Sequence, residues 1–261
     1  MRNTAIYHLP GLFEFYELYR RFLPLFRTHR EYFYDWCEIG SLYGAPENCL
    51  WGGGRFSCGE CDPQAMMALL REYGISARLT FSNSLLREEH LTDKKCNELC
   101  KMFEHASDAD NSPHTHRLQN VVPDFRLNKA FAQLETLARA EKDKVEFLCN
   151  ECCWTGCRDR KRCYEVVSRQ NLGEDCPDHR CAAPDAAQGY RFSKAMRSPA
   201  FIGVEDIKET YLPMGFSNFK IEGRGLGSAL VLEFLLYYLV KPEHQLEVRE
   251  EIYLDNMLDL F

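Results

Sequence analysis

Short apolar runs alternate along this chain with segments whose apolar side chains recur every three or four residues. The runs have the length of buried strands, and the periodic segments are typical of amphipathic helices. Strand followed by helix, repeated several times, predicts a parallel α/β sheet. The expected strands are residues 34–39, 76–81, 119–125, 144–150 and 218–222. The expected helices are one within residues 11–33 that ends near Pro24, and residues 63–73, 93–103, 129–140, 204–212 and 227–240.

The segments between these elements indicate how many domains the chain has. The 261 residues contain no internal repeat and no linker long enough to split the chain. We therefore expect a single domain over residues 1–261, with an N-terminal helix and a cysteine-rich insertion at about residues 149–189.

Charge and hydropathy restrict the class of protein. The net charge of -7 argues against a protein that coats nucleic acid. The longest apolar run, residues 229–240, is interrupted by Glu233 and is shorter than a membrane span. The N-terminal residues lack the small-residue cleavage site of a signal peptide. We expect a cytoplasmic protein without a membrane span.

Thirteen cysteines are far more than a chain of this size requires. A disulfide framework is not expected without an export signal, so the thiols point to metal ligation. Seven lie within 33 residues, directly after the expected strand 144–150: Cys149, Cys152, Cys153, Cys157, Cys163, Cys176 and Cys181. Thiolates bind iron–sulfur clusters and zinc, and neighbouring arginines stabilise the thiolate form. Four of the six thiols from Cys152 to Cys181 are expected to converge on one centre, and we favour Cys153, Cys157, Cys176 and Cys181. Small buried side chains and surface thiols are the alternative.

A second set of thiols is less specific. Cys58 and Cys61 are spaced as half of a zinc site, and Cys96 and Cys100 could supply the other half. Incidental thiols are the simpler interpretation, and Cys37 and Cys49 are expected to be structural. His105, His114 and His116 lie in a polar segment and are expected to be solvated.

Polar residues also follow the expected strands. Lys220, Glu222 and Arg224 have the spacing of two that places side chains on one face of a strand. Such charges are costly inside a sheet unless they are paired or bind an anion. Arg55 follows three glycines, Gly52–Gly54, and Glu151 ends the cysteine-bearing strand. These five residues are the candidate catalytic set, and a solvent-exposed face is the alternative. Arg78, Asn83 and Asn150 are further polar residues at strand ends.

Four blocks of the chain resemble one protein family. KVEFLCNECCWTGCRDRKRCYEV and NFKIEGR are similar to the two signatures of the collagenase-like peptidase family U-thirty-two, and YGAPENCLWGGGR and RLTFSN are similar to two further blocks of a bacterial subgroup. The two signatures are fairly specific together and weak apart.

The resemblance implies a TIM-like (βα) barrel. It also implies a [4Fe–4S] cluster on four cysteines, which match Cys153, Cys157, Cys176 and Cys181 here, with Cys163 as a substitute ligand. Many members of the family resemble proteins of cofactor-dependent hydroxylation that act on RNA bases or quinone precursors. The implied partners are a small-molecule or RNA substrate and a redox partner.

The chain also departs from the family. A polar segment stands between Cys100 and Gln119 where a further strand–helix unit is expected. A barrel of six to eight strands is therefore expected, and an incomplete barrel and a degenerate copy of the family are the two interpretations of this segment. The leading hypothesis is an iron–sulfur barrel protein that acts as an oxygen-independent hydroxylating or related redox enzyme. The alternatives are a peptidase or other hydrolase, and a non-enzymatic protein stabilised by zinc.

Overall fold

The structure is a computed structural model that describes residues 4–54, 59–107, 119–121, 136–151, 153–154 and 157–258. Its strands are β1 (Ala5–Pro10), β2 (Cys37–Gly44), β3 (Ser76–Leu79), β4 (Gln119–Val121), β5 (Val145–Leu148) and β6 (Asn218–Lys220). Its helices are α1 (Tyr16–Thr28), α2 (Pro63–Tyr73), α3 (Lys94–Ser107), α5 (Arg139–Lys142), α6 (Arg160–Asn171), α7 (Phe192–Met196), α8 (Val204–Asp206), α9 (Ser228–Leu239) and α10 (Gln245–Leu258). Short 3-10 turns cover Arg30–Tyr32, Glu88–Thr92, Ala186–Gln188 and Pro242–His244, and a π-helical turn covers Ile207–Tyr211.

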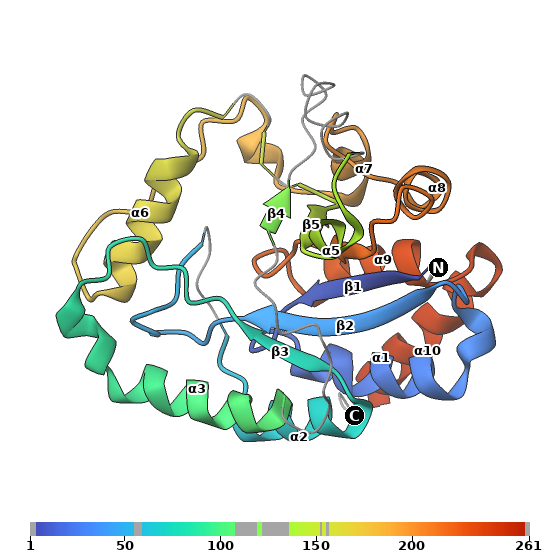
Figure 1. The fold of residues 1–261 in the computed structure, drawn as a ribbon, viewed down its shortest axis with the longest axis horizontal. Helices are drawn as coiled ribbons and strands as arrows, with labels where there is room; N and C mark the ends of the chain where they lie inside the picture. Colours follow the sequence, from blue (N-terminus) through green and yellow to red (C-terminus); the bar gives the residue numbers. More distant parts are fainter. Residues whose placement is uncertain are drawn as a thin grey trace.

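One parallel sheet organises these elements. Its six strands have the order β3-β2-β1-β6-β5-β4, and each neighbouring pair is parallel. The carboxyl ends of all six strands therefore meet at one edge of the sheet (Figure 1). The prediction of a parallel α/β fold is confirmed.

The expected strands 34–39, 76–81, 144–150 and 218–222 correspond to β2, β3, β5 and β6 of this sheet. The strand β2 begins three residues later than expected and continues to Gly44. The central strand β1 was missed, because its six residues precede a segment that we assigned to a helix. It lies between β2 and β6 and pairs with both.

The helix α2 shows why some elements are predictable from local signals. Asp62 caps its first turn by accepting hydrogen bonds from the backbone amides of Gln64 and Ala65, at 3.1 and 3.2 Å. Gly74 ends it with a φ of 65°, in the left-handed region that favours glycine. The predicted bounds 63–73 are confirmed.

Two helix ends differ from the prediction. The helix α1 does not end at Pro24 but continues to Thr28, and the Thr28 hydroxyl donates to the carbonyl of Pro24 at 2.9 Å. Proline removes only one helical hydrogen bond, and the buried residues Phe22 and Leu23 hold the helix on the core on the N-terminal side of Pro24. The helix α3 extends to Ser107, so the expected loop 104–116 begins later than predicted. Residues 108–116, 122–125 and 129–135 of the expected loop, strand and helix lie outside the described residues.

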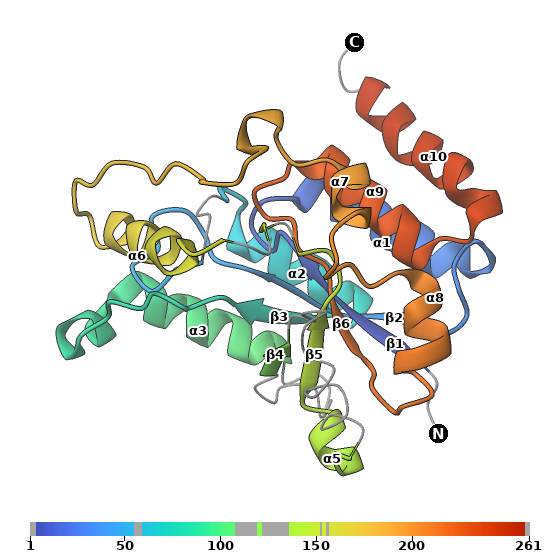
Figure 2. The same cartoon turned by 90° about the horizontal axis from the view of Figure 1, so that it is seen from above.

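The apolar core is one cluster that includes residues of the sheet and of the helices α1, α2, α3, α9 and α10. Tyr7 of β1 packs against Tyr238 of α9, with ring centroids 5.9 Å apart, and Phe219 of β6 joins it at 6.1 Å. Figure 2 shows α1, α9 and α10 grouped together, whereas α6 lies apart from them at the other end of the molecule. The segment that carries most of the clustered cysteines is therefore placed away from the main core.

Candidate functional site

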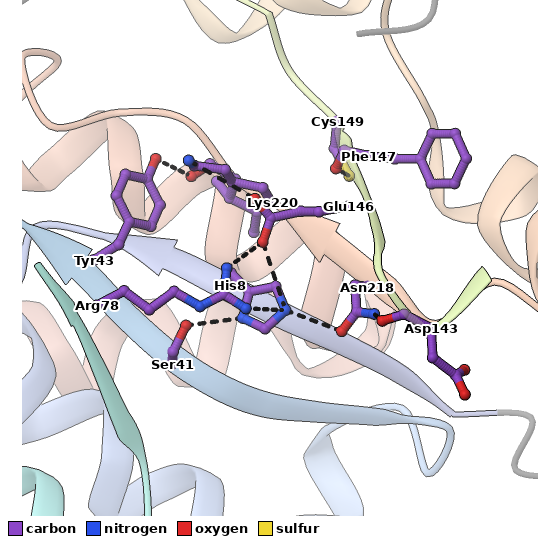
Figure 3. A network of polar contacts seen from close by, with 11 residues as sticks. His8, Ser41, Tyr43, Arg78, Asp143, Glu146, Phe147, Cys149, Asn218 and Lys220 are labelled. Carbon is purple, nitrogen blue, oxygen red and sulfur yellow. Dashed lines mark hydrogen bonds and ion pairs between the residues drawn. The ribbon is translucent and has the colours of Figure 1, made fainter. Parts of the chain in front are cut away.

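The sheet carries a polar network on the face opposite Tyr7 and α9, which we call the inner face. Side chains alternate between the two faces of a strand, so the neighbours of Tyr7 on β1 point to the inner face. Every described strand except β4 contributes to the network. Its members are His8, Ser41, Arg78, Glu146, Asn218 and Lys220, and Figure 3 shows them pointing toward one another.

His8 is the centre of this network and is 1% exposed. Its Nδ1 lies 2.8 Å from the hydroxyl of Ser41 on β2, and its Nε2 lies 3.2 Å from Oδ1 of Asn218 on β6. Asn218 is oriented because its Nδ2 donates to the carbonyl of Asp143 at 2.9 Å. Nη2 of Arg78 lies 3.1 Å from the same Nε2, so this nitrogen stands between a donor group and an acceptor oxygen.

A bulge in β2 brings Ser41 to His8. The register between β1 and β2 shifts so that Tyr7 pairs with Ile39 whereas His8 pairs with Ser41, with Gly40 as the additional residue. A Cβ atom at Gly40 would lie 2.4 Å from Cγ2 of Ile6 and 3.1 Å from the His8 ring. Glycine is therefore required at this bulge for the hydroxyl and the imidazole to meet.

Glu146 on β5 supplies the negative charge of the network. Its Oε2 accepts a hydrogen bond from Arg78 of β3 and lies 3.7 Å from Nε2 of His8, and its Oε1 lies 3.8 Å from Nζ of Lys220. Lys220 also lies over the ring of Tyr43, with Nζ 4.2 Å from the centroid. A single buried carboxylate thus holds two cations from different strands.

The carboxylate of the network is more deeply buried than the two cations that it pairs with. The side chain of Glu146 is 2% exposed, whereas those of Arg78 and Lys220 are 24% and 20% exposed. The same arrangement recurs near the carboxyl ends of the strands, where the Glu14 side chain is 3% exposed and that of Arg224 is 11% exposed. A molecule that approaches the inner face therefore meets cations, with the balancing carboxylates behind them.

Glu14 and Arg224 form this second polar group. Arg224 donates to the Thr80 hydroxyl and to the carbonyl of Gly53, both at 3.1 Å, and its Nη1 lies 3.9 Å from Oε1 of Glu14. Oε2 of Glu14 accepts from the amide of Phe13 at 3.1 Å, whereas its buried Oε1 accepts no hydrogen bond from the residues that the structure describes. Burial raises the pKa of Glu14 to about 7, although Arg224 opposes the rise.

Asn150 and Glu151 follow β5 and connect its end to neighbouring segments. Asn150 exchanges two hydrogen bonds with the backbone of Glu222, at 2.9 and 2.7 Å. Glu151 is 3% exposed and accepts from the amide of Cys153 at 2.8 Å and from Arg160 at 3.0 Å. Asn150 therefore fixes two strand ends to each other, and Glu151 fixes the start of the cysteine-rich segment.

Four of the five residues that we expected to form a catalytic set lie among the described residues. Lys220 belongs to the inner-face network, and Arg224 lies beside Glu14 and Thr80. The Glu222 side chain is half-buried, and Glu151 accepts hydrogen bonds from the amide of Cys153 and from Arg160. Arg55 lies outside the described residues.

The thiols of the cysteine-rich segment differ in burial. Cys149 is fully buried, and burial raises its pKa, so it packs as an apolar side chain. Cys153, Cys157, Cys163 and Cys176 are half-buried, Cys181 is exposed, and Cys152 lies outside the described residues. Within the described ranges, no three histidine, cysteine or acidic side chains lie close enough together to hold one metal ion. The expected convergence of four thiols is thus not seen among these residues.

The second set of thiols is arranged differently from the prediction. Cys96 of α3 contacts Cys49, with the two Sγ atoms 3.4 Å apart and both residues fully buried. Cys61 donates its thiol to the carbonyl of Asp62 at 3.4 Å, and Cys58 lies outside the described residues. Cys37 donates to the carbonyl of Tyr34 in the core, consistent with a structural thiol.

Sequence reasoning missed His8, Ser41, Glu146 and Glu14. The histidines that we considered were in the polar segment, whereas His8 stands inside an apolar run, Ala5–Pro10, bounded by Gly11. A histidine within a short apolar run was the available signal for it. Glu146 carried a similar signal, because it interrupts the apolar strand Val145–Leu148.

The comparisons with known proteins add no relative. No family model, curated protein or solved structure matches the chain. Among the described residues, no helix is both long and apolar enough to cross a bilayer.

Proposed function

We propose that the chain is a barrel enzyme, related to the collagenase-like peptidase family U-thirty-two, that acts on a small anionic substrate at the inner face. The observation that supports it is the polar network around His8 and Glu146, drawn from five strands. The interior of a parallel barrel is normally filled with branched apolar side chains. Buried polar groups in their place are costly and are typical of binding and catalytic sites.

The strand order supports a barrel. The order β3-β2-β1-β6-β5-β4 is the cyclic order of six consecutive strands opened between β3 and β4. Successive strands of a (βα) barrel are neighbours in this way, and its active site lies at the carboxyl ends of the strands. Lys220 is the last residue of β6, and Arg224 and Glu14 come from segments that follow β6 and β1.

The charges support an anionic substrate. Arg78 and Lys220 are partly exposed while Glu146 beneath them is buried, so a carboxylate or phosphate group could bind the cations without displacing their internal partner. His8 and Ser41 lie next to these cations and could hold or move a proton. The role of the network is then to bind and orient the substrate and to retain a proton near it.

The order Ser41–His8–Glu146 also resembles that of a hydrolase with a serine nucleophile. Ser41 is 1% exposed, however, and the carboxylate lies 3.7 Å from the imidazole. A nucleophile must reach the substrate, so this burial favours a positioning role for Ser41 over a peptidase mechanism.

The thiols of residues 153–181 are the proposed ligands of a [4Fe–4S] cluster, with zinc as the alternative metal. Their chemistry suits either, because they are thiols beside arginines, and Glu151 accepts a hydrogen bond from the amide of the first of them. Their described positions do not form a site, so we propose that this segment folds around the metal when it binds. A bound cluster would supply electron transfer, and the steps assigned above to His8, Ser41 and the cations do not depend on it.

Calorimetry tests the anion site. Inorganic phosphate and succinate should bind the purified protein, and Lys220→Gln should weaken binding about tenfold, since one charge-assisted contact contributes ~1.5 kcal/mol or more. Lys161→Gln is the matched control, because Lys161 is an exposed lysine on α6 paired with Glu165. Equal affinity in the parent and Lys220→Gln, or binding of neutral succinamide as tightly as succinate, would contradict the proposal.

Anaerobic purification tests the metal proposal. The parent should contain iron and acid-labile sulfide, Cys157→Ser should lose them, and Cys61→Ser, which alters a half-buried thiol outside the segment, should keep them. Zinc without sulfide in the parent would favour the zinc-stabilised alternative. Full iron content in Cys157→Ser would show that the ligand set is wrong.

A further inference from the structure

The contact between Cys49 and Cys96 brings two thiols together that the proposed function does not use. Cys49 lies in the loop between β2 and α2, and Cys96 lies in the first turn of α3, 47 residues later. Their Sγ atoms are 3.4 Å apart, and both side chains are fully buried. A disulfide needs a sulfur separation of about 2 Å, so a shift of little more than 1 Å would allow the bond.

Both backbones are held in place near this contact. The amide of Cys96 donates to Oδ1 of Asp93 at 2.8 Å, and the carbonyl of Cys49 accepts from the amide of Gly52 at 2.8 Å. Two further contacts tie the loop to α3 and to the segment before it. The Trp51 ring donates to the carbonyl of His90 at 2.6 Å, and Nζ of Lys95 donates to the carbonyl of Glu47 at 3.0 Å. The two thiols therefore face each other because the surrounding hydrogen bonds fix the loop against α3.

We propose that Cys49 and Cys96 are a redox pair that forms a reversible disulfide with a peroxide as oxidant. One thiolate sulfur attacks a peroxide oxygen, the O–O bond breaks, and a sulfenic acid and one water form after proton transfer. The second thiol attacks that sulfur, the S–O bond breaks, and the S–S bond forms with release of a second water. Two thiols lose two electrons, and the peroxide is reduced to two waters.

Burial sets the conditions for this reaction. It raises the pKa of the Cys96 thiol, and the hydrogen bond to Asp93 raises it further, so the thiolate is rare. Oxidation therefore requires a small oxidant and a local opening of the loop. The same burial shields the disulfide from bulky thiols, so reduction is also slow.

The disulfide would stiffen the loop that leads to the inner face. Four residues after Cys49, the carbonyl of Gly53 accepts from Arg224 at 3.1 Å. Gly53 itself is packed tightly, because a Cβ there would lie 2.4 Å from the backbone of Ser82. Fixing Cys49 to α3 restricts the backbone that positions Gly53 and, through it, the guanidinium of Arg224.

Peptide mapping tests the pairing. The full chain is treated with hydrogen peroxide, remaining thiols are alkylated in denaturant, and the digest is analysed by mass spectrometry without reduction. A linked Cys49–Cys96 peptide that disappears with dithiothreitol is expected in the parent. It is also expected in Cys100→Ser, the matched control one helical turn from Cys96, and not in Cys49→Ser or Cys96→Ser.

The oxidised parent should also unfold at a higher temperature, by about 5 °C or more, because the bond closes a long loop. Amide exchange over residues 45–54 should slow in the oxidised parent and in oxidised Cys100→Ser. Failure of the linked peptide to form, or pairing of either thiol with another cysteine, would overturn the proposal. A linked peptide without slower exchange would overturn the coupling to Gly53. None of these readouts depends on anion or metal binding.

Discussion

Replacing Glu146 with glutamine removes the negative charge that pairs with Arg78 and Lys220 on the inner face, and it leaves the size of the side chain nearly unchanged. Glutamine has the same shape and keeps an oxygen that can accept from Arg78. The loss is therefore the attraction to Arg78 and to Lys220, whose Nζ lies 3.8 Å from Oε1. Removing one partner of a fully buried pair costs about 3–5 kcal/mol. Because Arg78 and Lys220 are partly exposed and can be hydrated, we expect about 2–3 kcal/mol for Glu146→Gln.

Glu17→Gln is a matched control, because it removes a carboxylate from an ion pair that is short but exposed to solvent. Glu17 pairs with Arg20 at 2.7 Å, but the side chains of Glu17 and Arg20 are 63% and 48% exposed. Solvent screens such a pair, so Glu17→Gln should change the free energy of unfolding by less than about 1 kcal/mol. Urea unfolding of the parent and both variants, with m-values compared, measures the two effects. If Glu146→Gln costs no more than Glu17→Gln, the buried carboxylate does not hold the network as we argue.

Further predictions concern the groups around this network. Asn150→Ala should cost about 2 kcal/mol in urea unfolding, because it removes both hydrogen bonds to the backbone of Glu222 and leaves those groups unpaired. Tyr43→Phe should cost only about 1 kcal/mol, since it loses the hydroxyl bond to Ile221 but keeps the ring beneath Lys220; a loss as large as that of Tyr43→Leu would contradict this. Glu14 has a raised pKa in the folded state, so its contribution is fully present below about pH 4.5 and is lost as the pH rises through about 7. Glu14→Gln should therefore gain on the order of 2–3 kcal/mol relative to the parent between pH 5 and pH 8, and a pH-independent difference would refute the assignment.

The predictable parts of this fold are those specified by neighbouring residues. The helix α2 could be bounded from sequence because its cap, Asp62, and its terminating glycine, Gly74, act within a few residues. The apolar strand β5 was similarly evident. The strand β1 was not, since Tyr7 and His8 occupy a run too short to distinguish a central strand from the approach to a helix. Its central position arises from pairing with β6, more than two hundred residues away in the chain.

The site was less predictable than the fold for the same reason. Lys220 and Arg224 were expected from a spacing of two along one strand, which is a local pattern. The pairing of Glu146 with Arg78 spans 68 residues, and nothing near either residue indicates it. The contact of Cys49 with Cys96 likewise depends on how a loop packs on α3, and the sequence suggested a different grouping. Only the three-dimensional arrangement of the strands selects these partners.

The inner face is more polar than stability alone would favour. Replacing buried ion pairs by well-packed apolar side chains is often neutral or stabilising, so the Glu146 network is not explained by its contribution to folding. It also requires Gly40 at a bulge, which lets Ser41 meet His8, and an Asn218 side chain oriented toward His8. Departures from local design rules that converge on one place are expected where a protein binds or transforms a ligand. The cations Arg78 and Lys220 are partly exposed above the buried Glu146, and this is the feature on which we base the proposal of an anionic substrate.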